Sequence, residues 1–272
     1  MLEKTDQSYL LKEQYKDAAN LNARIRLHAR FGTNTYGWHE WVFDQMQEAP
    51  AGRILELGCG PGFLWRINFD RVPDTWQITL SDFSAGMLQE AQTALGQRAQ
   101  RFNFQVIDAQ AIPFADASLD VVIANHMLYH VPDRPKALAE IRRVLAPAGR
   151  LYASTVGTQH LKEVGDLIHH VAPDFIWGVA TEEFTLENGA AQLAPYFSSV
   201  LLRRQENALV VTEAQPLVEY ILSGQAARVF VGERLEQLRS LIEQRLAEHG
   251  AISITSVSGL FVASQGVDHD SA

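Results

Sequence analysis

The chain has 272 residues, a formal net charge of −9 at pH 7 and a hydrophobic fraction of 47%. An acidic balance disfavours a nucleic-acid-binding surface, which normally carries a basic patch. No apolar run reaches the roughly 18 residues of a membrane helix, and the first residues lack the layout of a signal peptide. Cys59, the one cysteine, excludes disulfides within the chain and multi-cysteine zinc sites. We therefore expect a soluble, cytoplasmic protein with no nucleic-acid or membrane partner.

Residues 1–50 are predicted to form helices, because apolar side chains recur there at helical spacing. These positions are Leu21, Ile25 and Phe31 in a first stretch and Trp38, Trp41, Val42 and Met46 in a second.

The segment 53–62 reads Arg-Ile-Leu-Glu-Leu-Gly-Cys-Gly-Pro-Gly and is the most informative part of the chain. Its apolar run predicts a buried parallel strand, and its glycines allow a sharp turn and the close approach of a ligand to the backbone. A dinucleotide-binding fingerprint would place a third small residue where this chain has Phe63. The loop therefore indicates a nucleotide-like ligand and disfavours a dehydrogenase.

Strands and helices then alternate up to residue 156. Strands are predicted at 77–80, 102–107, 119–124 and 151–156. One helix should begin after Ser84 and end at Gly96, and another should begin at Asp133 and end at residues 147–149. This alternation predicts a doubly wound parallel sheet.

The remaining chain is predicted to be a mixture of helices and two late strands. Two helical stretches are expected around Pro173 and Trp177, and a strand at 200–212 could pair with one at 253–263. The strands flank an amphipathic helix with apolar positions Leu235, Leu238, Ile242 and Leu246. No linker marks a second domain, so we expect one domain over 1–272, divided into 1–50, a core at 51–156, a helical insertion at 157–195 and a C-terminal part at 196–272.

Polar side chains lie at the ends of four predicted strands: Glu56, Asp82, Asp108 and Asn125. The carboxyl ends of parallel strands meet at one edge of a doubly wound sheet, and ligands bind there. We therefore expect these four residues to contact the ligand.

Together these motifs resemble those of class I S-adenosylmethionine-dependent methyltransferases, small-molecule branch. The resemblance covers residues 50–156 and includes Glu56-Leu-Gly-Cys-Gly-Pro-Gly62, Asp82, Asp108-Ala109 and Ile112-Pro-Phe114. It departs from the family pattern at Pro147-Ala-Gly149, where Pro-Gly-Gly is more frequent. The resemblance implies a Rossmann-like, mostly parallel seven-stranded sheet, with antiparallel sixth and seventh strands and N-terminal helices that cover the cofactor.

The resemblance also implies roles in binding S-adenosyl-L-methionine. An ionised carboxylate can accept two hydrogen bonds, which suits Asp82 to the two ribose hydroxyls. The other implied positions are Asp108 and Ala109 at the adenine edge, Phe83 and Met87 beside the adenine, Glu56 and Asn125 near the methionine ammonium, Gly58 and Gly60 along the methionine tail, and Met127 in the adenosyl pocket. Gly62 is the third glycine of this predicted cofactor-binding loop.

Residues for the chemical step and for the acceptor are less clearly marked. His126 and His130 could act as a general base, or they could pack within their loop. Their spacing lacks the glutamate of a zinc-binding H-E-x-x-H helix, so we expect no metal. Candidates for the acceptor pocket are Tyr15, Trp38, Phe175 and Trp177.

We predict an enzyme that transfers a methyl group from S-adenosylmethionine to an oxygen, nitrogen or sulfur atom of a small organic acceptor, driven mainly by proximity and orientation. Two alternatives are a protein or tRNA methyltransferase and a non-catalytic S-adenosylmethionine-binding regulatory module. A monomer or a homodimer would be compatible with the sequence, which does not identify the acceptor.

Overall fold

The computed structural model describes residues 19–46, 52–178 and 183–265. Its seven strands form one sheet in the order β3-β2-β1-β4-β5-β7-β6. The first five strands are parallel, and β7 is antiparallel to both of its neighbours. The strands are β1 Arg53–Leu57, β2 Gln77–Asp82, β3 Asn103–Val106, β4 Leu119–Asn125, β5 Leu145–Val156, β6 Ser199–Val211 and β7 Ile252–Ser264. The predicted doubly wound sheet with two antiparallel late strands is confirmed.

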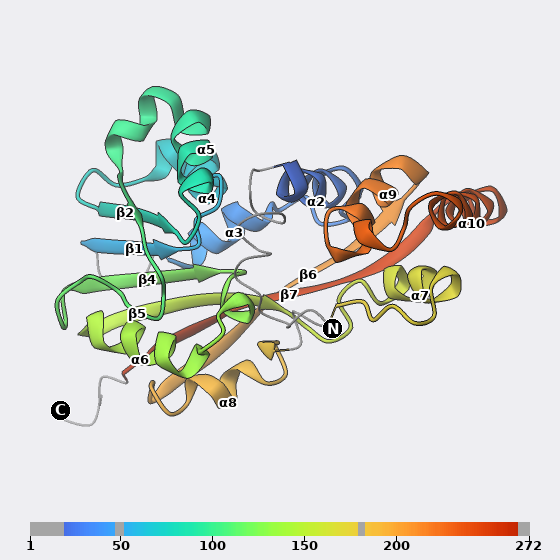
Figure 1. The fold of residues 1–272 in the computed structure, drawn as a ribbon. Helices are drawn as coiled ribbons and strands as arrows, with labels where there is room; N and C mark the ends of the chain where they lie inside the picture. Colours follow the sequence, from blue (N-terminus) through green and yellow to red (C-terminus); the bar gives the residue numbers. More distant parts are fainter. Residues whose placement is uncertain (1–18, 47–51, 179–182, 266–272) are drawn as a thin grey trace.

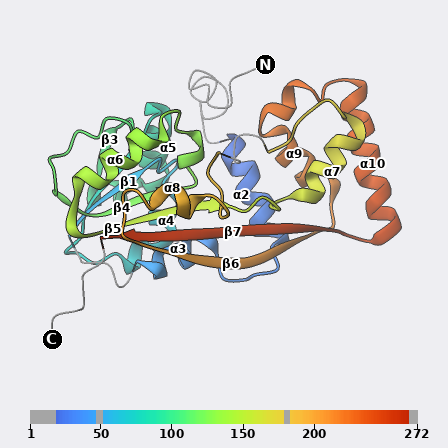
Figure 2. The ribbon, with the colours of Figure 1, turned by 90° about the horizontal axis from the view of Figure 1, so that it is seen from below.

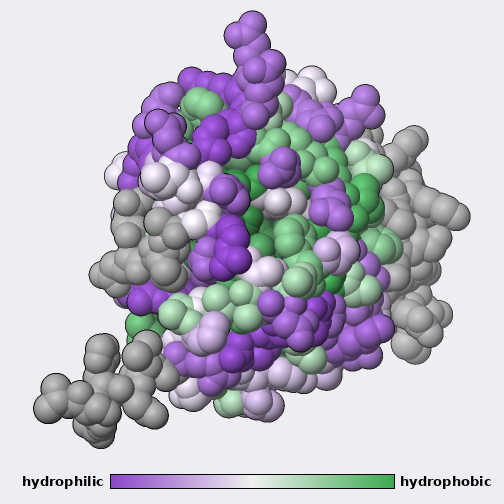
Figure 3. Space-filling model, turned by 90° about the vertical axis from the view of Figure 1, so that its left-hand side faces the viewer, coloured by the Kyte–Doolittle hydropathy of each residue, from purple (hydrophilic) through white to green (hydrophobic). Residues whose placement is uncertain are grey.

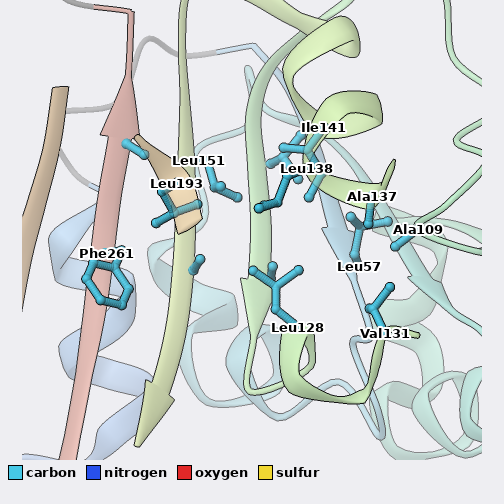
Figure 4. Packing of buried hydrophobic residues seen from close by; sticks show 14 of the residues in the cluster. Leu57, Ala109, Leu128, Val131, Ala137, Leu138, Ile141, Leu151, Leu193 and Phe261 are labelled. Carbon is cyan, nitrogen blue, oxygen red and sulfur yellow. The ribbon is translucent and has the colours of Figure 1, made fainter. Parts of the chain in front are cut away.

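Helices cover both faces of this sheet (Figure 1). One face packs against α3 Trp38–Gln45, α4 Phe63–Asn68 and α5 Ala85–Leu95, and the other against α6 Arg134–Val144 and α8 Gly189–Leu193. Figure 4 shows Leu138 and Ile141 of α6 beside Leu151 of β5 in the second of these layers. Short 3-10 helices lie at Phe69–Arg71, Gly96–Arg101, Leu128–His130 and Gln225–Arg228.

The last two strands extend well beyond the parallel part of the sheet. β7 pairs with β5 only from Ser258 to Ser264, whereas it pairs with β6 along its whole length. Around the extension gather α2 Ala19–Phe31, α7 Lys162–Val171, α9 Ala214–Leu222 and α10 Glu233–His249 (Figures 1 and 2). The extension therefore supports a second hydrophobic cluster, separate from the two that cover the parallel strands.

The predicted helix ends at Ser84, Asp133 and Gly250 are confirmed. The Ser84 hydroxyl accepts a hydrogen bond from the Met87 amide at 3.3 Å, and Asp133 accepts one from Lys136 at 3.0 Å. Each bond satisfies an amide that the first turn of a helix leaves without a partner. Gly250 ends α10 in a left-handed conformation, as expected of a helix C-terminus.

The structure differs from the predicted secondary structure at three places. The described stretch around Trp177 is not helical, because α7 ends at Val171, before Pro173. Residues 147–149 do not precede the fifth strand but lie inside it, where its pairing with β4 shifts in register. Helix α9 is not among the predicted elements. Pro216 lies in its first turn, where proline is tolerated because those amides have no partner within the helix.

The surface mixes polar and apolar residues. On the face drawn in Figure 3, hydrophobic residues gather near the middle and hydrophilic residues surround them. Within the described ranges, no helix is both long and apolar enough to span a bilayer.

Candidate active site

A cavity of about 820 Å³ lies at the carboxyl ends of the parallel strands. Three parts of the chain line it: the strand ends with the glycine loop, the helices α2 and α3, and a wall made by the loop after β5, β7 and α9. Figure 1 shows α2 between the parallel strands and α9. The sequence-predicted cofactor residues that line the cavity are Glu56, Gly58, Gly60, Asp82, Phe83, Met87, Asp108, Ala109, Asn125 and Met127.

The glycine loop requires glycine for two physical reasons. Gly58, Gly60 and Gly62 have φ values of 68°, 52° and 72°, which side chains rarely adopt. A Cβ atom on Gly58 would also lie 2.9 Å from the Cβ of Met127. Gly62 does not line the cavity; it faces Ala91 of α5, whose Cβ is 3.5 Å from the place a Gly62 Cβ would take. It therefore shapes the turn into α4.

The Asp82 carboxylate is held by the backbone on both sides. Oδ2 accepts the Gly60 amide at 3.0 Å, and Oδ1 accepts the Ser84 amide at 2.8 Å. Burial raises the pKa of Asp82, while these backbone hydrogen bonds lower it. The side chain thus links the end of β2 to the glycine loop of β1 and presents a fixed acceptor to the cavity.

The carboxyl group of Glu56 is almost completely buried. It is 2% exposed, and its Oε2 accepts a hydrogen bond of 2.6 Å from the indole of Trp65 in α4. Burial raises the pKa of Glu56 to about 7, against a smaller opposing effect of the Trp65 bond and with a further rise from the charge of Asp82. A carboxyl group in this state is suited to a cationic ligand, whose charge would restore the ionised form.

The residues predicted to contact the adenine follow the ends of β2 and β3. Both oxygens of Asp108 accept from the Gln110 side chain, at 3.0 and 3.1 Å, and Oδ1 also accepts the Gln110 amide at 2.9 Å. Met87 is buried, whereas Phe83 is 38% exposed. This part of the cavity thus offers one oriented carboxylate between apolar side chains.

The end of β4 is hydrogen-bonded to α3 and to β5. Asn125 Oδ1 accepts the indole N–H of Trp38 at 3.3 Å and the hydroxyl of Ser154, which in turn accepts the amide of His126 at 3.0 Å. His126 has φ 54°, a conformation that non-glycine residues adopt mostly under local constraint. Its ring lies 5.0 Å from that of Trp38, measured between centroids.

The comparisons with known proteins agree with this geometry. Residues 55–153 match the family model described as a methyltransferase domain. The chain carries a class I S-adenosylmethionine-dependent methyltransferase domain. The cofactor of this class is S-adenosylmethionine.

Relatives with curated names match mainly over this domain. The ubiquinone/menaquinone biosynthesis C-methyltransferase UbiE of Geotalea daltonii is 31% identical over 56% of the chain and 65% of its own length. UbiE of Desulfotalea psychrophila is 35% identical over 42% of the chain and 45% of its length. The malonyl-[acyl-carrier protein] O-methyltransferase of Serratia marcescens is 32% identical over 43% of each. The chain thus spans about half the length of the curated relatives it matches.

Solved structures share the methyltransferase fold at low sequence identity. Phosphoethanolamine N-methyltransferase 2 of Haemonchus contortus superposes with a TM-score of 0.58 and 18% identity, over 97% of this chain and 61% of that one. The YcgJ protein of Bacillus subtilis superposes with a TM-score of 0.57 and 15% identity, over 84% of this chain and 98% of that one.

Five histidines line the cavity of this methyltransferase domain: His28, His39, His126, His130 and His160. Burial lowers the pKa of His126 and of His130 to about 3. Both rings are therefore neutral at physiological pH and hold a proton less readily than an exposed histidine. Among the described residues, no group of three or more His, Cys, Asp and Glu is arranged to hold a metal ion.

The acceptor-pocket candidates are distributed differently from the cofactor residues. Trp38 lines the cavity, and Tyr15 lies outside the described residues. The structure places Phe175 and Trp177 outside the described lining, because both pack against the second hydrophobic cluster. The indole of Trp177 covers Gly165 of α7.

Other lining residues were not singled out from the sequence, notably Arg24 and His28 of α2, His160 after β5 and Tyr220 of α9. They come from three distant segments, so no local motif joins them. Only helical periodicity indicated that α2 has an inner face, and it did not show what that face meets.

Proposed function

We propose that this protein transfers a methyl group from S-adenosylmethionine to a small organic acceptor. The observation that supports this most is the composition of one cavity. It combines fixed carboxylates and a left-handed glycine loop at the strand ends with a more apolar wall from α2, α9 and β7. A cavity of about 820 Å³ is within the usual range for small-molecule sites. A cavity of this size favours a small acceptor over a protein or tRNA.

We propose that the cofactor is held by the residues at the strand ends. Asp82 would accept the ribose hydroxyls, Asp108 and Ala109 would bind the adenine edge, and Glu56 with Asn125 would face the ammonium group. Phe83, Met87 and Met127 would supply apolar contacts, and Gly58 and Gly60 would leave their backbone open to the methionine tail. The donor set fits a ligand with two hydroxyls and a cationic amine, because carboxylates accept from both.

The protein's own contribution is to orient the acceptor and exclude water. S-adenosylmethionine, when bound, supplies an activated methyl group and departs as a neutral thioether. Holding the acceptor in line can account for roughly 7–11 kcal/mol of the barrier. His126 and His130, neutral through burial, suit hydrogen bonding to the acceptor better than storage of its proton.

The acceptor atom is open to a wider choice than oxygen, nitrogen or sulfur. Relatives of the domain are named as carbon and as oxygen methyltransferases, so we include carbon in the proposal. We also infer that the described parts of the chain work as one domain, because β6 and β7 belong to the same sheet as the strands of the cofactor half.

S-adenosylhomocysteine should raise the melting temperature of the protein, whereas NAD should not. A ligand that binds only the native state stabilises it by about 2.7 kcal/mol at a hundredfold excess over its dissociation constant. Differential scanning fluorimetry with each compound at millimolar concentration measures this directly. An equal shift with NAD, or no shift with either ligand, would contradict the proposal; turnover with an acceptor then separates an enzyme from a non-catalytic binding module.

Cofactor binding at pH 6.5 should release a proton from Glu56. The carboxyl group, with a pKa of about 7 in the free protein, is mostly protonated at that pH, and a nearby ammonium would favour its ionised form. Calorimetric titrations with S-adenosylhomocysteine in two buffers of different ionisation enthalpy report the number of protons released.

The release should vanish in Glu56→Gln and at pH 9, where the group is already ionised. It should also vanish with 5′-methylthioadenosine, which lacks the amino-acid tail. Equal release with this truncated ligand would show that Glu56 does not face the ammonium.

A further inference from the structure

One wall of the cavity has no part in the proposed cofactor contacts. It is built by α2, the loop after β5, β7 and α9, and its lining includes Ile25, His28, Val156, His160, Tyr220 and Ser256. Most of these elements belong to the second hydrophobic cluster, on the extension of β6 and β7. This wall is held mainly by packing on the extension, although Leu21 of α2 also lies beside Gly60 of the glycine loop, and its chemistry bears on the acceptor.

His160 is held in one orientation by the backbone of β7. Its Nδ1 accepts the amide hydrogen of Val257 at 3.1 Å, and its loop is pinned by the bonds Gly157 N–H to Val257 O and Leu161 N–H to Thr255 O, of 3.0 and 2.8 Å. Burial keeps the pKa of His160 well below its ordinary value, and the positive charge of a protonated His28 or His126 would lower this pKa further. A neutral ring that accepts at Nδ1 carries its hydrogen on Nε2. The wall thus contains a fixed N–H donor.

Two further rings stand beside this donor. The ring of His28 is parallel to that of His160 within 2°, with 5.8 Å between centroids, and the ring of Tyr220 meets His28 edge-on at 6.1 Å. Burial lowers the pKa of His28 to about 4, so the ring is an uncharged aromatic surface. Flat aromatic ligands pack well against such surfaces, in offset or edge-to-face contact.

The charges of the lining favour an acceptor that is not cationic. Within the described lining, the carboxylates are Glu40 of α3 and the three at the strand ends, Glu56, Asp82 and Asp108; this wall contributes none. It contributes instead the guanidinium of Arg24, which donates to the Ser223 hydroxyl and carbonyl oxygens, both at 2.9 Å. An ammonium group buried here would lose water without gaining a nearby counter-charge.

We propose that His28, His160 and Tyr220 form the acceptor subsite of this methyltransferase, and that the subsite takes a flat ring bearing a hydroxyl or carbonyl oxygen, uncharged or anionic. The oxygen accepts the Nε2 hydrogen of His160, and the ring lies against His28 and Tyr220. His160 is a specificity-determining residue in this arrangement. The proposal rests on the proposed function, because the subsite is complete only beside a bound methyl donor.

Two probes with the same ring system test the charge preference. The full chain is saturated with S-adenosylhomocysteine and titrated with 2-naphthol or with 2-naphthylmethylamine, a cation at pH 7, and ligand-observed NMR gives the dissociation constants. We expect 2-naphthol to bind at least about tenfold more tightly, since an uncompensated buried charge costs more than 1.4 kcal/mol. Tighter or equal binding of the amine, or binding of neither probe, would overturn the proposal.

The variant His160→Asn tests the assigned donor. Its side-chain carbonyl can still accept the Val257 amide, but asparagine is too short to place a donor at the position of Nε2. We expect 2-naphthol to bind about 3–10-fold more weakly, while the dissociation constant of S-adenosylhomocysteine stays the same. His249→Asn, at a side chain 61% exposed on α10, is the matched control and should change neither value.

An unchanged affinity for 2-naphthol in a folded His160→Asn would overturn the role of His160. The two-probe comparison uses the unaltered chain, so it remains decisive should the variant fail to fold. Failure of the unaltered chain to bind S-adenosylhomocysteine would overturn the proposed function and this inference together. Retained S-adenosylhomocysteine binding with no binding of either naphthalene probe would overturn the inference alone.

Discussion

Replacing Asp82 with asparagine is expected to weaken the binding of S-adenosylhomocysteine by about 1.5–3 kcal/mol, the usual range for hydrogen bonds to a charged group. The carboxylate is fixed by the amides of Gly60 and Ser84, so its remaining acceptor positions point in set directions. An amide of the same size loses one acceptor oxygen and turns an N–H₂ group toward groups that themselves donate. Isothermal titration calorimetry measures the change.

The control for this variant is Asp74→Asn, an identical change at an exposed position between α4 and β2. It should leave the dissociation constant unaltered. Because Asp82 also links two loops, the melting temperature of the free variant must be recorded with the affinity. A dissociation constant that does not change in Asp82→Asn would refute the assignment of this carboxylate to the ribose.

Replacing Trp65 with phenylalanine is expected to destabilise the protein by about 2–4 kcal/mol near pH 8.5. Trp65 is fully buried, and its indole donates to the Glu56 carboxylate at 2.6 Å. The smaller ring leaves unfilled space in the core and leaves a buried carboxylate without its donor, which alone costs about 1–3 kcal/mol. Denaturant unfolding at fixed pH gives the free-energy difference.

The stability lost in Trp65→Phe should depend on pH, and the pKa of Glu56 sets the direction of this dependence. Its pKa is raised to about 7 in the folded chain, above the ordinary value of 4.5. The stability that the protonated carboxyl confers is therefore full below about pH 4.5 and is lost as the pH rises through 7. Since Trp65 stabilises the ionised form, Trp65→Phe should cost less at pH 5 than at pH 8.5.

Two further variants separate the hydrogen bond from the packing. Trp76→Phe changes a buried tryptophan of the same cluster, whose indole makes no side-chain hydrogen bond within the described residues, so its cost should not vary with pH. Glu56→Gln in the Trp65→Phe background should recover part of the loss, and the double-mutant cycle gives the coupling free energy. A pH-independent cost for Trp65→Phe would mean that packing alone explains its effect.

The residues that line the cavity at the strand ends could be predicted from the sequence because each of their signals is local. A strand, a turn and a polar strand end follow one another within a few residues, as in Glu56 to Gly62, and parallel topology then brings such ends together. Ser84 and Asp133 fixed their helix starts for the same reason, since a cap acts on an amide three residues away. The doubly wound parallel sheet followed from the alternation of strands and helices, whereas the order of its strands was known only from the structure.

The other half of the site could not be read in this way. His28 and His160 face each other only because α2 packs on α9 and the loop after β5 folds against β7. No periodicity in either segment encodes such a long-range contact. Trp177 is a predicted acceptor-pocket residue because it is aromatic and lies in the segment 157–195, but an aromatic side chain serves equally well in a core, and it packs over Gly165.

The extension of β6 and β7 beyond β5 bears on how such a chain diverges. The last of the parallel strands, β5, ends at residue 156, and the matched methyltransferase domain ends at 153. The helices that carry His28 and Tyr220 pack instead on the part of β6 and β7 that extends beyond β5. Insertion or exchange of helices on this part of β6 and β7 can change the proposed acceptor wall while the residues at the strand ends keep their positions. Under the proposed function, selection for a new acceptor can therefore act on this end of the molecule with little change at the proposed cofactor site.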